Sequence, residues 1–365
     1  MTGPGALVWF KRDLRVRDHA ALAAAMHFEN ALGLVVIEPQ WLESPECDPR
    51  HVGFLLACVS ELQRDLAARG LPLLVRTGAM PRVLQTLRLE FPFSHLFSHE
   101  ETGPGWSYTR DLAVADWCRS QGVQWTELPQ TGVVRRLRSR TGWAGRWAQR
   151  MNAPEAPAAG GFSVATGLEA CAVPTLRELG LPALGAPLPS GGERAAWAAL
   201  EGFLRGRGRD YRRAMSSPLT ATDGCSRLSA HLAFGTISMR CVHQATEARI
   251  AATPDRSLAY GLRGFASRLR WHCHFMQKLE DEPAIEWRNV ARTVDGLRPG
   301  DGVHEAPVDL VMGLEVRPEK LKKIEFGQAL DRRQGIFLRQ DNLQLREKPC
   351  IIGFTEQFHV DGVDD

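Results

Sequence analysis

The stretch at residues 225–240 carries the residue types of an anion site and reads Cys-Ser-Arg-Leu-Ser-Ala-His-Leu-Ala-Phe-Gly-Thr-Ile-Ser-Met-Arg. A turn is predicted at Asp223 and Gly224, after which the hydroxyl of Ser226 or Ser229 can cap a helix. Free backbone N–H groups and the positive end of the helix dipole at such a start attract a phosphate or a diphosphate. An ordinary capped helix without a ligand explains the same local pattern, so the residue types alone leave both interpretations open.

The same stretch is similar to a family motif. Ser-Arg-Leu-Ser at residues 226–229, then four variable residues and Gly-Thr-Ile-Ser-Met-Arg, resembles the flavin-diphosphate motif of the cryptochrome/photolyase family. Family members usually have Thr where this chain has Cys225, and a thiol is the weaker hydrogen-bond partner. Tyr211 resembles a flavin-contacting tyrosine ahead of that motif, although a lone tyrosine is more often a packing residue than a ligand. The resemblance implies that FAD is held in this segment by Tyr211, Cys225, Ser226, Arg227, Leu228 and Ser229.

A predicted helix at residues 258–279 holds further candidates, and its residues 265–275 read Phe-Ala-Ser-Arg-Leu-Arg-Trp-His-Cys-His-Phe. His272 and His274 are two residues apart and point to different sides of a helix, so no metal site is predicted. The segment resembles the family's helix along the flavin and lesion cavity, where Trp271 matches a tryptophan that stacks on a flipped-out pyrimidine pair. Stacking on an aromatic ring is worth roughly 1–3 kcal/mol per base.

The resemblance also assigns roles along this helix. Phe265 and His272 are implied to contact the flavin, and Trp271 is implied to take part in catalysis by stacking on the lesion. DNA contacts are implied for Arg268, Trp271 and Phe275. The chain departs from the family at two of these positions, because Arg268 stands where many members have Glu and His272 where many have Arg.

The first third of the chain alternates short apolar runs with amphipathic segments, and this rhythm predicts a parallel α/β sheet with right-handed crossovers. The strands are predicted at residues 6–10, 32–37, 73–76, 95–98 and 123–126. The helices between them are predicted at residues 20–25, 51–68, 81–89 and 107–120. A Gly-x-Gly-x-x-Gly motif does not follow the first strand, which disfavours a nicotinamide-type site.

The end of the first predicted strand is highly charged, because three cations and one carboxylate lie within residues 11–15. Ligands of parallel sheets sit at the carboxyl ends of the strands, so this loop can bind an anion. A loop whose charges satisfy one another explains the residues equally well. Trp-Phe-Lys-Arg-Asp-Leu-Arg at residues 9–15, with Arg-Asp-His at 17–19, is similar to the opening signature of the cryptochrome/photolyase family. That resemblance implies a second, light-harvesting antenna chromophore of unknown identity in this domain.

A change in amino-acid composition at residues 151–192 predicts a domain boundary. Six prolines, many glycines and alanines, and no sustained period indicate a connector, with at most one short helix at residues 174–179. Beyond it, residues 193–213 are predicted to form a helix with one apolar stripe. The predicted divisions are a photolyase-like α/β domain at 1–135, a connector at 136–192, the N-terminal part of a helical FAD-binding domain at 193–297, and an unassigned tail at 298–365.

The resemblance covers about residues 5–297, and the family's later motifs are not found in residues 299–365. All ten tryptophans lie at or before Trp287, so the family's flavin-reducing tryptophan chain cannot form in its usual way. The tail predicts a helix at residues 319–330 and a strand at 350–354. The missing motifs belong to segments that line one side of the flavin ring. Without them the ring is exposed to water, which costs about 25 cal/mol per Å² of apolar surface that is not buried. We therefore expect weak FAD binding and poor repair.

Composition places the chain among ordinary globular proteins, with 365 residues, 24% charged, 44% hydrophobic and a net charge of +3 at pH 7. No apolar run approaches the roughly 20 residues of a membrane span, so a membrane partner is not expected. The eight cysteines are scattered singly, which disfavours zinc and a disulfide framework and indicates reduced thiols. Because residues 1–7 carry no secretory signal, we expect a cytoplasmic protein, and a monomer.

Together these features predict a parallel, Rossmann-like α/β domain followed by a mainly α-helical flavin domain that is incomplete. The resemblance implies light-driven electron transfer from reduced FAD to cyclobutane pyrimidine dimers in damaged DNA, the carbon–carbon lyase activity of a deoxyribodipyrimidine photolyase. One alternative is a cryptochrome-like light-signalling protein or an inactive flavin- and DNA-binding remnant. Another is a nucleotide-binding α/β module without flavin.

Overall fold

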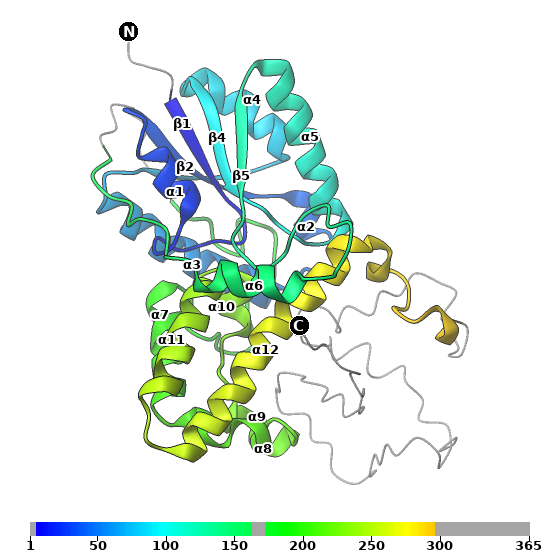
Figure 1. The fold of residues 1–365 in the computed structure, drawn as a ribbon. Helices are drawn as coiled ribbons and strands as arrows, with labels where there is room; N and C mark the ends of the chain where they lie inside the picture. Colours follow the sequence, from blue (N-terminus) through cyan, green and yellow to red (C-terminus); the bar gives the residue numbers. More distant parts are fainter. Residues whose placement is uncertain (1–4, 163–171, 296–365) are drawn as a thin grey trace.

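The computed structural model describes residues 5–162 and 172–295, which form an α/β domain and a helical domain packed end to end (Figure 1). The helix predicted at 319–330 and the strand predicted at 350–354 lie outside the described residues. Within the described part, none of the helices has the length and apolarity that a membrane crossing demands.

A five-stranded parallel sheet organises the first domain, with strand order β3-β2-β1-β4-β5. All five strands lie where the sequence predicts them, with ends that differ by up to two residues. The bounds are β1 Gly5–Phe10, β2 Ala31–Ile37, β3 Leu73–Thr77, β4 Phe93–His99 and β5 Gln124–Leu128. The predicted helices of this domain are confirmed as α1 Ala20–Ala25, α3 Pro49–Ala67, α4 Met80–Glu90 and α5 Gly105–Gln121, and a short α2 spans Pro39–Leu42.

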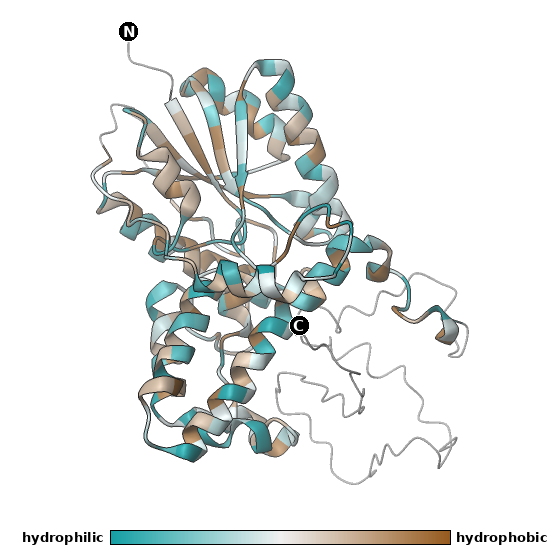
Figure 2. Cartoon of the chain, viewed as in Figure 1, coloured by the Kyte–Doolittle hydropathy of each residue, from teal (hydrophilic) through white to brown (hydrophobic). Residues whose placement is uncertain are grey.

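The central strand β1 is buried along its whole length and divides its side chains between two cores. Ala6, Val8 and Phe10 pack on the side of α1 and α3, whereas Leu7 and Trp9 pack on the side of α4 and α5. This alternation is the two-residue period of a strand with helices on both faces. Figure 2 shows hydrophobic residues on the inner strands, whereas the edge strand β5 carries hydrophilic residues.

The second domain is built from short helices around α12, Arg256–Asp281, which is the long helix predicted at 258–279. Its core joins apolar residues of α6, α7, α11 and α12. The remaining bounds are α6 Trp143–Asn152, α7 Glu193–Arg205, α8 Tyr211–Ala214, α9 Pro218–Gly224, α10 Ser229–Ala233 and α11 Met239–Ala252, with 3₁₀ turns at Arg207–Asp210, Pro283–Glu286 and Arg292–Val294.

The single helix predicted at residues 193–213 is wrong, because α7 ends at Arg205 and a 3₁₀ turn follows before α8. The 3₁₀ turn after α7 passes close to the backbone of α12, and this contact accounts for the break. A Cβ atom placed on Gly261 of α12 would lie 2.1 Å from the carbonyl oxygen of Gly208, so the two backbones touch at this point. The short helix predicted at residues 174–179 is also not formed, and residues 176–180 make a turn instead.

The predicted turn at Asp223 and Gly224 is the last turn of α9 rather than a loop. Neither Ser226 nor Ser229 caps the next helix, because Leu228 occupies the N-cap position of α10 without a side-chain cap. Helix α10 ends at Ala233, and Gly235 then turns the chain with a φ of +63°. A Cβ atom there would lie 2.0 Å from the carbonyl oxygen of Arg12 in the other domain.

Asp18 joins the two domains through its carboxylate. It accepts hydrogen bonds from the Ala156 N–H at 2.8 Å and from the Arg240 guanidinium at 2.7 Å, and also from the Ser238 hydroxyl that caps α11. Asp18 is buried and has a φ of +51°, which Asp tolerates better than most residues do.

We expect the Asp18→Ala variant to lose about 3 kcal/mol of unfolding free energy, because it leaves Arg240 without its buried partner. Denaturant unfolding followed by circular dichroism measures the change. Asp116→Ala, which removes an exposed carboxylate paired with Arg119 on α5, is the matched control and should stay within about 0.5 kcal/mol. Equal losses in the two variants would contradict the role assigned to Asp18.

Candidate functional site

The predicted anion site is the loop at residues 225–229, which runs from the end of α9 to the first residue of α10. Arg207 binds the backbone of this loop. The guanidinium of Arg207 donates to the carbonyl oxygens of Cys225 at 3.3 Å and of Ser226 at 3.1 Å, and to that of Ala199 in α7 at 3.1 Å. Sequence reasoning did not single out Arg207, although it lies in an arginine-rich segment at residues 205–213.

The outer side of this loop presents hydrogen-bond donors. Ser229 and Arg227 are exposed, and Arg227 has a φ of +61° with its guanidinium 3.2 Å from the Thr222 carbonyl oxygen. The Ser226 hydroxyl accepts a long hydrogen bond of 3.4 Å from the Leu228 N–H. The first N–H groups of α10 have no acceptor in their own helix, as at any helix start. Hydroxyls, N–H groups and a guanidinium are the donors that suit a phosphate, and the binding of the FAD diphosphate by this loop stays a prediction.

Tyr211 and Phe265, both predicted to contact the flavin, lie together in the helical core. Their rings and that of Phe203 meet edge to face, with centroids 4.7–5.6 Å apart. Burial raises the pKa of Tyr211 to about 12, although the charge of Arg268 opposes the shift. The two rings and Leu228 are buried, so packing accounts for their present positions and their contact with a cofactor stays a prediction.

The three residues predicted to bind DNA lie along one face of α12, because their spacing of three and four residues repeats with the helix turn. Trp271 and Phe275 are 46% and 41% exposed, and their ring centroids are 5.9 Å apart. The guanidinium carbon of Arg268 lies 5.4 Å from the Trp271 ring, and the Lys278 ammonium lies 5.6 Å from the Phe275 ring. The sequence reasoning missed Lys278, which the same period of the helix identifies. We call Arg268, Trp271, Phe275 and Lys278 the aromatic-cation face.

His272 lies next to Trp271 in the chain but belongs to a different surface. With Met276 it lines a cleft between the two domains, opposite Glu101 and Gln130. Its Nδ1 is buried and has no hydrogen-bond partner among the residues that the structure describes. Burial lowers the pKa of His272 to about 4. The structure therefore separates His272 from the aromatic-cation face, and its contact with the flavin stays a prediction.

The cations of the loop after β1 are paired with groups that lie outside the loop. The Lys11 ammonium lies 3.1 Å from Asp111 and 3.3 Å from Glu127, and Arg12 pairs with Glu101 at 3.7 Å. The guanidinium of the buried Arg15 donates to the carbonyl oxygens of Arg17, Asp18 and Gly235. The cations of the loop are thus paired, as one of the two interpretations expects, but their partners lie after β4, in α5 and in β5 rather than within the loop itself.

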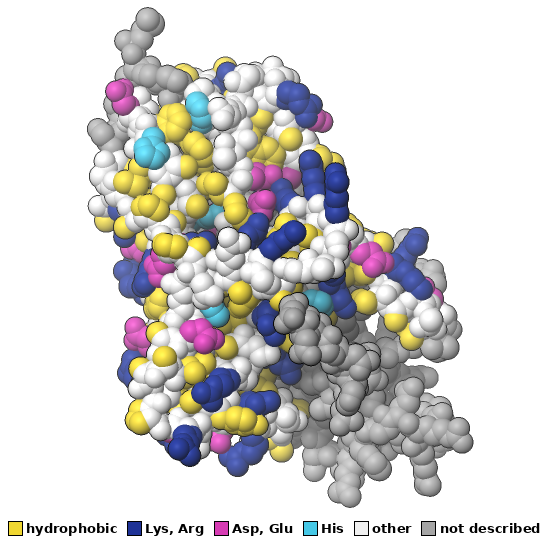
Figure 3. Space-filling model, in the orientation of Figure 1, with side chains coloured by type: hydrophobic (Ala, Val, Ile, Leu, Met, Phe, Trp, Pro, Cys, Tyr) yellow, Lys and Arg dark blue, Asp and Glu magenta, His cyan; other side chains and the backbone are white. Residues whose placement is uncertain are grey.

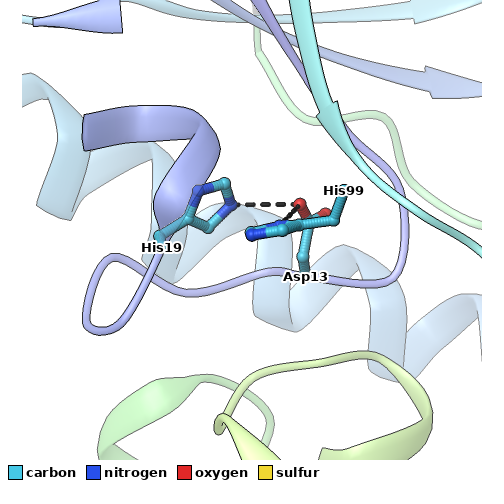
Figure 4. A group of neighbouring side chains, drawn as sticks. All are labelled: Asp13, His19 and His99. Atoms are coloured by element: carbon cyan, nitrogen blue, oxygen red, sulfur yellow. Dashed lines mark hydrogen bonds and ion pairs between the residues drawn. The ribbon is translucent and has the colours of Figure 1, made fainter. Parts of the chain in front are cut away.

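Asp13 of this loop lies between two histidines (Figure 4). Its Oδ2 is 2.7 Å from His99 Nδ1 and 3.0 Å from His19 Nε2, and its Oδ1 accepts the Lys11 N–H at 2.7 Å. Burial opposes the carboxylate charge, yet the hydrogen bonds from His19 and His99 hold the pKa of Asp13 well below its usual range. Burial lowers the pKa of His19, and it lowers that of His99 to about 3, so both rings are neutral.

These three side chains are close enough for a metal ion, but their protons disfavour one. His19 Nδ1 accepts the Leu22 N–H at 3.1 Å and caps α1, so the proton of this neutral ring is on Nε2. A protonated nitrogen has no lone pair for a metal. The Asp13 oxygen is also only 2.7 Å from His99 Nδ1, which is a hydrogen-bond distance. The group acts as a buried polar anchor of the β1 loop, β4 and α1.

This anchor predicts acid sensitivity. Unfolded His99 gains a proton below about pH 6.5, whereas folded His99 stays neutral until about pH 3, so its contribution to stability falls as the pH decreases through this window. The slope is up to about 1.4 kcal/mol per pH unit. His99→Gln should be less stable than the parent at pH 7, with a difference that shrinks by pH 5. Thermal unfolding at both pH values tests this, with the exposed His27→Gln as a control that keeps the difference constant.

On one face of the molecule, the described Lys and Arg side chains do not gather into one basic stripe. Lys and Arg side chains are spread over both domains in the face that Figure 3 shows, and the net charge of the chain is only +3. Any contact with a polyanion therefore depends on local groups such as the aromatic-cation face rather than on a global field.

Comparisons with known proteins agree with this geometry. The family model described as DNA photolyase matches residues 6–142. A deoxyribodipyrimidine photo-lyase of a Synechococcus species is 26% identical over 300 residues, covering 76% of this chain and 61% of that protein. A bacterial class III photolyase from Agrobacterium tumefaciens has a similar fold, with a TM-score of 0.67 and 20% identity over 82% of this chain and 63% of that one. An archaeal photolyase from Sulfolobus tokodaii, described as having two FAD molecules that imply a novel light-harvesting cofactor, gives a TM-score of 0.63 at 20% identity, over 80% and 64% of the two chains.

The matched length agrees with the extent of the resemblance in the sequence. The chain spans 61–64% of the length of these proteins, and the match includes both the parallel sheet and described helices beyond it. The motifs at residues 9–19 and 226–240 lie in these two parts. Residues 6–142 therefore match the DNA photolyase family, and the described chain as a whole is similar to photolyases in sequence and fold.

Proposed function

We propose that this chain is a photolyase-like flavoprotein of the cytoplasm that binds FAD weakly in its helical domain and splits cyclobutane pyrimidine dimers in DNA with light at low efficiency. The observation that carries the proposal is the aromatic-cation face of α12, where two exposed rings lie between two cations. Exposed aromatic rings flanked by positive charge are the features that bind unstacked bases and their phosphates. The reaction itself, light-driven splitting of pyrimidine dimers, is inferred from the similarity to photolyases.

The cofactor and the DNA surface are proposed to meet around Tyr211. Arg268 on α12 lies near this side chain, because its charge opposes the rise in the pKa of Tyr211, and α8, which begins with Tyr211, packs against α9, which leads into the loop. Residues 193–297 are proposed as the FAD-binding part, residues 136–192 as the connector and residues 1–135 as the supporting α/β part. Within the connector, α6 packs into the core of the helical domain. The role of residues 298–365 is left open.

Each described residue has a physical task in this function. Ser226, Ser229 and the N–H groups of α10 would bind the FAD diphosphate, with Arg227 adding positive charge. Reduced FAD supplies the light-excited electron when it is bound. Trp271 would stack on the flipped-out lesion and replace the contacts that the lesion loses in the duplex. The side chains bind and orient the reacting groups, and the reaction needs no general base.

Two other functions differ in what they bind. A cryptochrome-like signalling protein or an inactive remnant binds flavin and DNA without repair. A nucleotide-binding α/β module binds no flavin at all. Flavin absorbance of the purified protein separates the last from the others, and light-driven repair of a dimer-containing oligonucleotide separates photolyase from remnant.

We expect the double variant Ser226→Ala, Ser229→Ala to retain less FAD than the parent after gel filtration, because two donors to the diphosphate are lost. A loss of about 1 kcal/mol per hydrogen bond corresponds to roughly a thirtyfold weaker affinity for the pair. Ser120→Ala in α5, which removes an exposed hydroxyl far from the loop in the chain, is the control. Unchanged flavin stoichiometry in the double variant would remove this loop as the diphosphate site.

Trp271→Ala should weaken binding to a dimer-containing oligonucleotide by about 1–3 kcal/mol, because the lesion loses its stacking partner. Fluorescence anisotropy measures the affinity. Trp287→Ala removes a tryptophan of similar exposure that lies outside α12, and this control should bind the oligonucleotide as the parent does.

Arg268→Ala should lower the slope of log affinity against log salt by about one, because one cation near the DNA phosphates is lost. An affinity that does not change with salt would argue against a DNA partner.

A further inference from the structure

The strand order of the sheet defines the place where a ligand is expected. The order β3-β2-β1-β4-β5 reverses between β1 and β4, and open α/β sheets bind their ligands outside the carboxyl ends of the strands at such a switch point. A crevice lies there, and the carboxyl ends of β1 and β4 point toward the helical domain in Figure 1. It is lined mainly by aromatic and charged side chains, among them Trp9, Arg12, Trp41, Glu101, Arg110 and Phe234.

Arg12 fills one side of this crevice. Its guanidinium carbon lies 4.8 Å from the ring centroid of Phe234 and 5.5 Å from that of Trp41. Phe234 comes from the helical domain and Trp41 from α2, so the guanidinium lies where segments of both domains meet. A guanidinium is planar and stacks on aromatic faces as a flat ring does. The slot that could hold a planar ligand is thus taken by a side chain of the protein itself.

Arg110 fills the other side in the same way. Its guanidinium carbon lies 4.8 Å from the Trp9 ring and 5.4 Å from the Trp106 ring, and it pairs with Glu38 at 3.0 Å. Glu101 bridges the two arginines, at 2.7 Å from Arg110 and 3.7 Å from Arg12. Burial opposes the charge of Glu101, but Arg110, Lys11 and Arg12 lower its pKa to about 2.

The space that remains is small. The cavity between these side chains has a volume of about 50 Å³, whereas pockets that hold drug-sized ligands have roughly 300–1,000 Å³. The polar groups of the crevice are paired with one another, so a ligand would have to break buried ion pairs to enter. The residues present here do not fit the second, light-harvesting chromophore that the family resemblance implies.

We propose that Arg12 is a built-in occupant of the switch-point crevice, which keeps flat heteroaromatic ligands out of the α/β domain. The side chain stands between Trp41 and Phe234 where a ring system would stack. Removal of the guanidinium opens the slot without removing the aromatic walls. The α/β domain of this chain therefore carries no pigment in the crevice, and light absorption depends on the helical domain.

The test is a titration of the full chain with riboflavin, which has the isoalloxazine ring but lacks the diphosphate that the loop at residues 225–229 would hold. We expect Arg12→Ala to bind one riboflavin at least tenfold more tightly than the parent, with quenching of flavin fluorescence by Trp41. Arg17→Ala is the matched control, because Arg17 also lies on a tryptophan ring, at 4.4 Å from Trp197, but outside the crevice. The Arg17→Ala variant should bind riboflavin with the same affinity as the parent.

Two results would overturn the proposal. One is tight one-to-one binding of riboflavin by the parent chain with quenching that Trp41→Phe alters, which would show that the crevice is open. The other is equal riboflavin affinity of a folded Arg12→Ala variant and the parent. Should Arg12→Ala fail to fold, Arg12→Gln keeps a polar group of smaller reach, and we expect its affinity to lie between those of the parent and an open slot. An Arg12→Gln affinity equal to that of the parent would again contradict the proposal.

Discussion

The balance of buried charge at the carboxyl edge of the sheet is the constraint on which the rest of this structure depends. Lys11, Arg12, Arg110 and Arg135 face the carboxylates of Glu38, Glu101, Asp111 and Glu127 there. Removing one partner of a buried pair leaves a charge that neither water nor protein compensates. The ends of β1, β2, β4 and β5 and the first turns of α5 must therefore keep their relative positions.

This constraint reaches the helical domain through the segment at residues 234–238. The Leu14 N–H donates to the Phe234 carbonyl oxygen at 3.1 Å, and Arg15 donates to that of Gly235 at 3.0 Å. Phe234 in turn covers the guanidinium of Arg12. Because α10 ends immediately before this segment, the loop at residues 225–229 is positioned by the α/β domain as well as by Arg207. The two domains thus share the task of holding the proposed diphosphate site.

The sequence predicts the elements whose signal is local. Each strand is an apolar run between turn residues, and the spacing of Arg268, Trp271 and Phe275 on α12 already places them on one face. The predictions that fail are those that depend on contacts between segments distant in the sequence. Serine hydroxyls near residue 226 predict a cap, but Arg207 binds the carbonyl oxygens of that loop and Leu228 takes the cap position. The break at residue 206 follows from a backbone crossing with Gly261 that no local pattern records. The role of Arg12 needs Trp41 and Phe234, which are distant in sequence from it and from each other.

Helix α12 ties the proposed nucleic-acid surface to this same framework. Its outer side carries the aromatic-cation face, while Gln277 on another side is buried and hydrogen-bonds both backbone groups of Val134, at 2.7 Å to its N–H and 3.0 Å to its carbonyl oxygen. Gln277 also accepts the Trp143 indole N–H at 3.1 Å. An amide whose donors and acceptor are all used resists rotation or sliding of the helix, because each broken contact leaves a buried polar group without a partner. Trp271 and Phe275 are therefore presented on a rigid support, and a base that stacks on them pays little to order the protein surface.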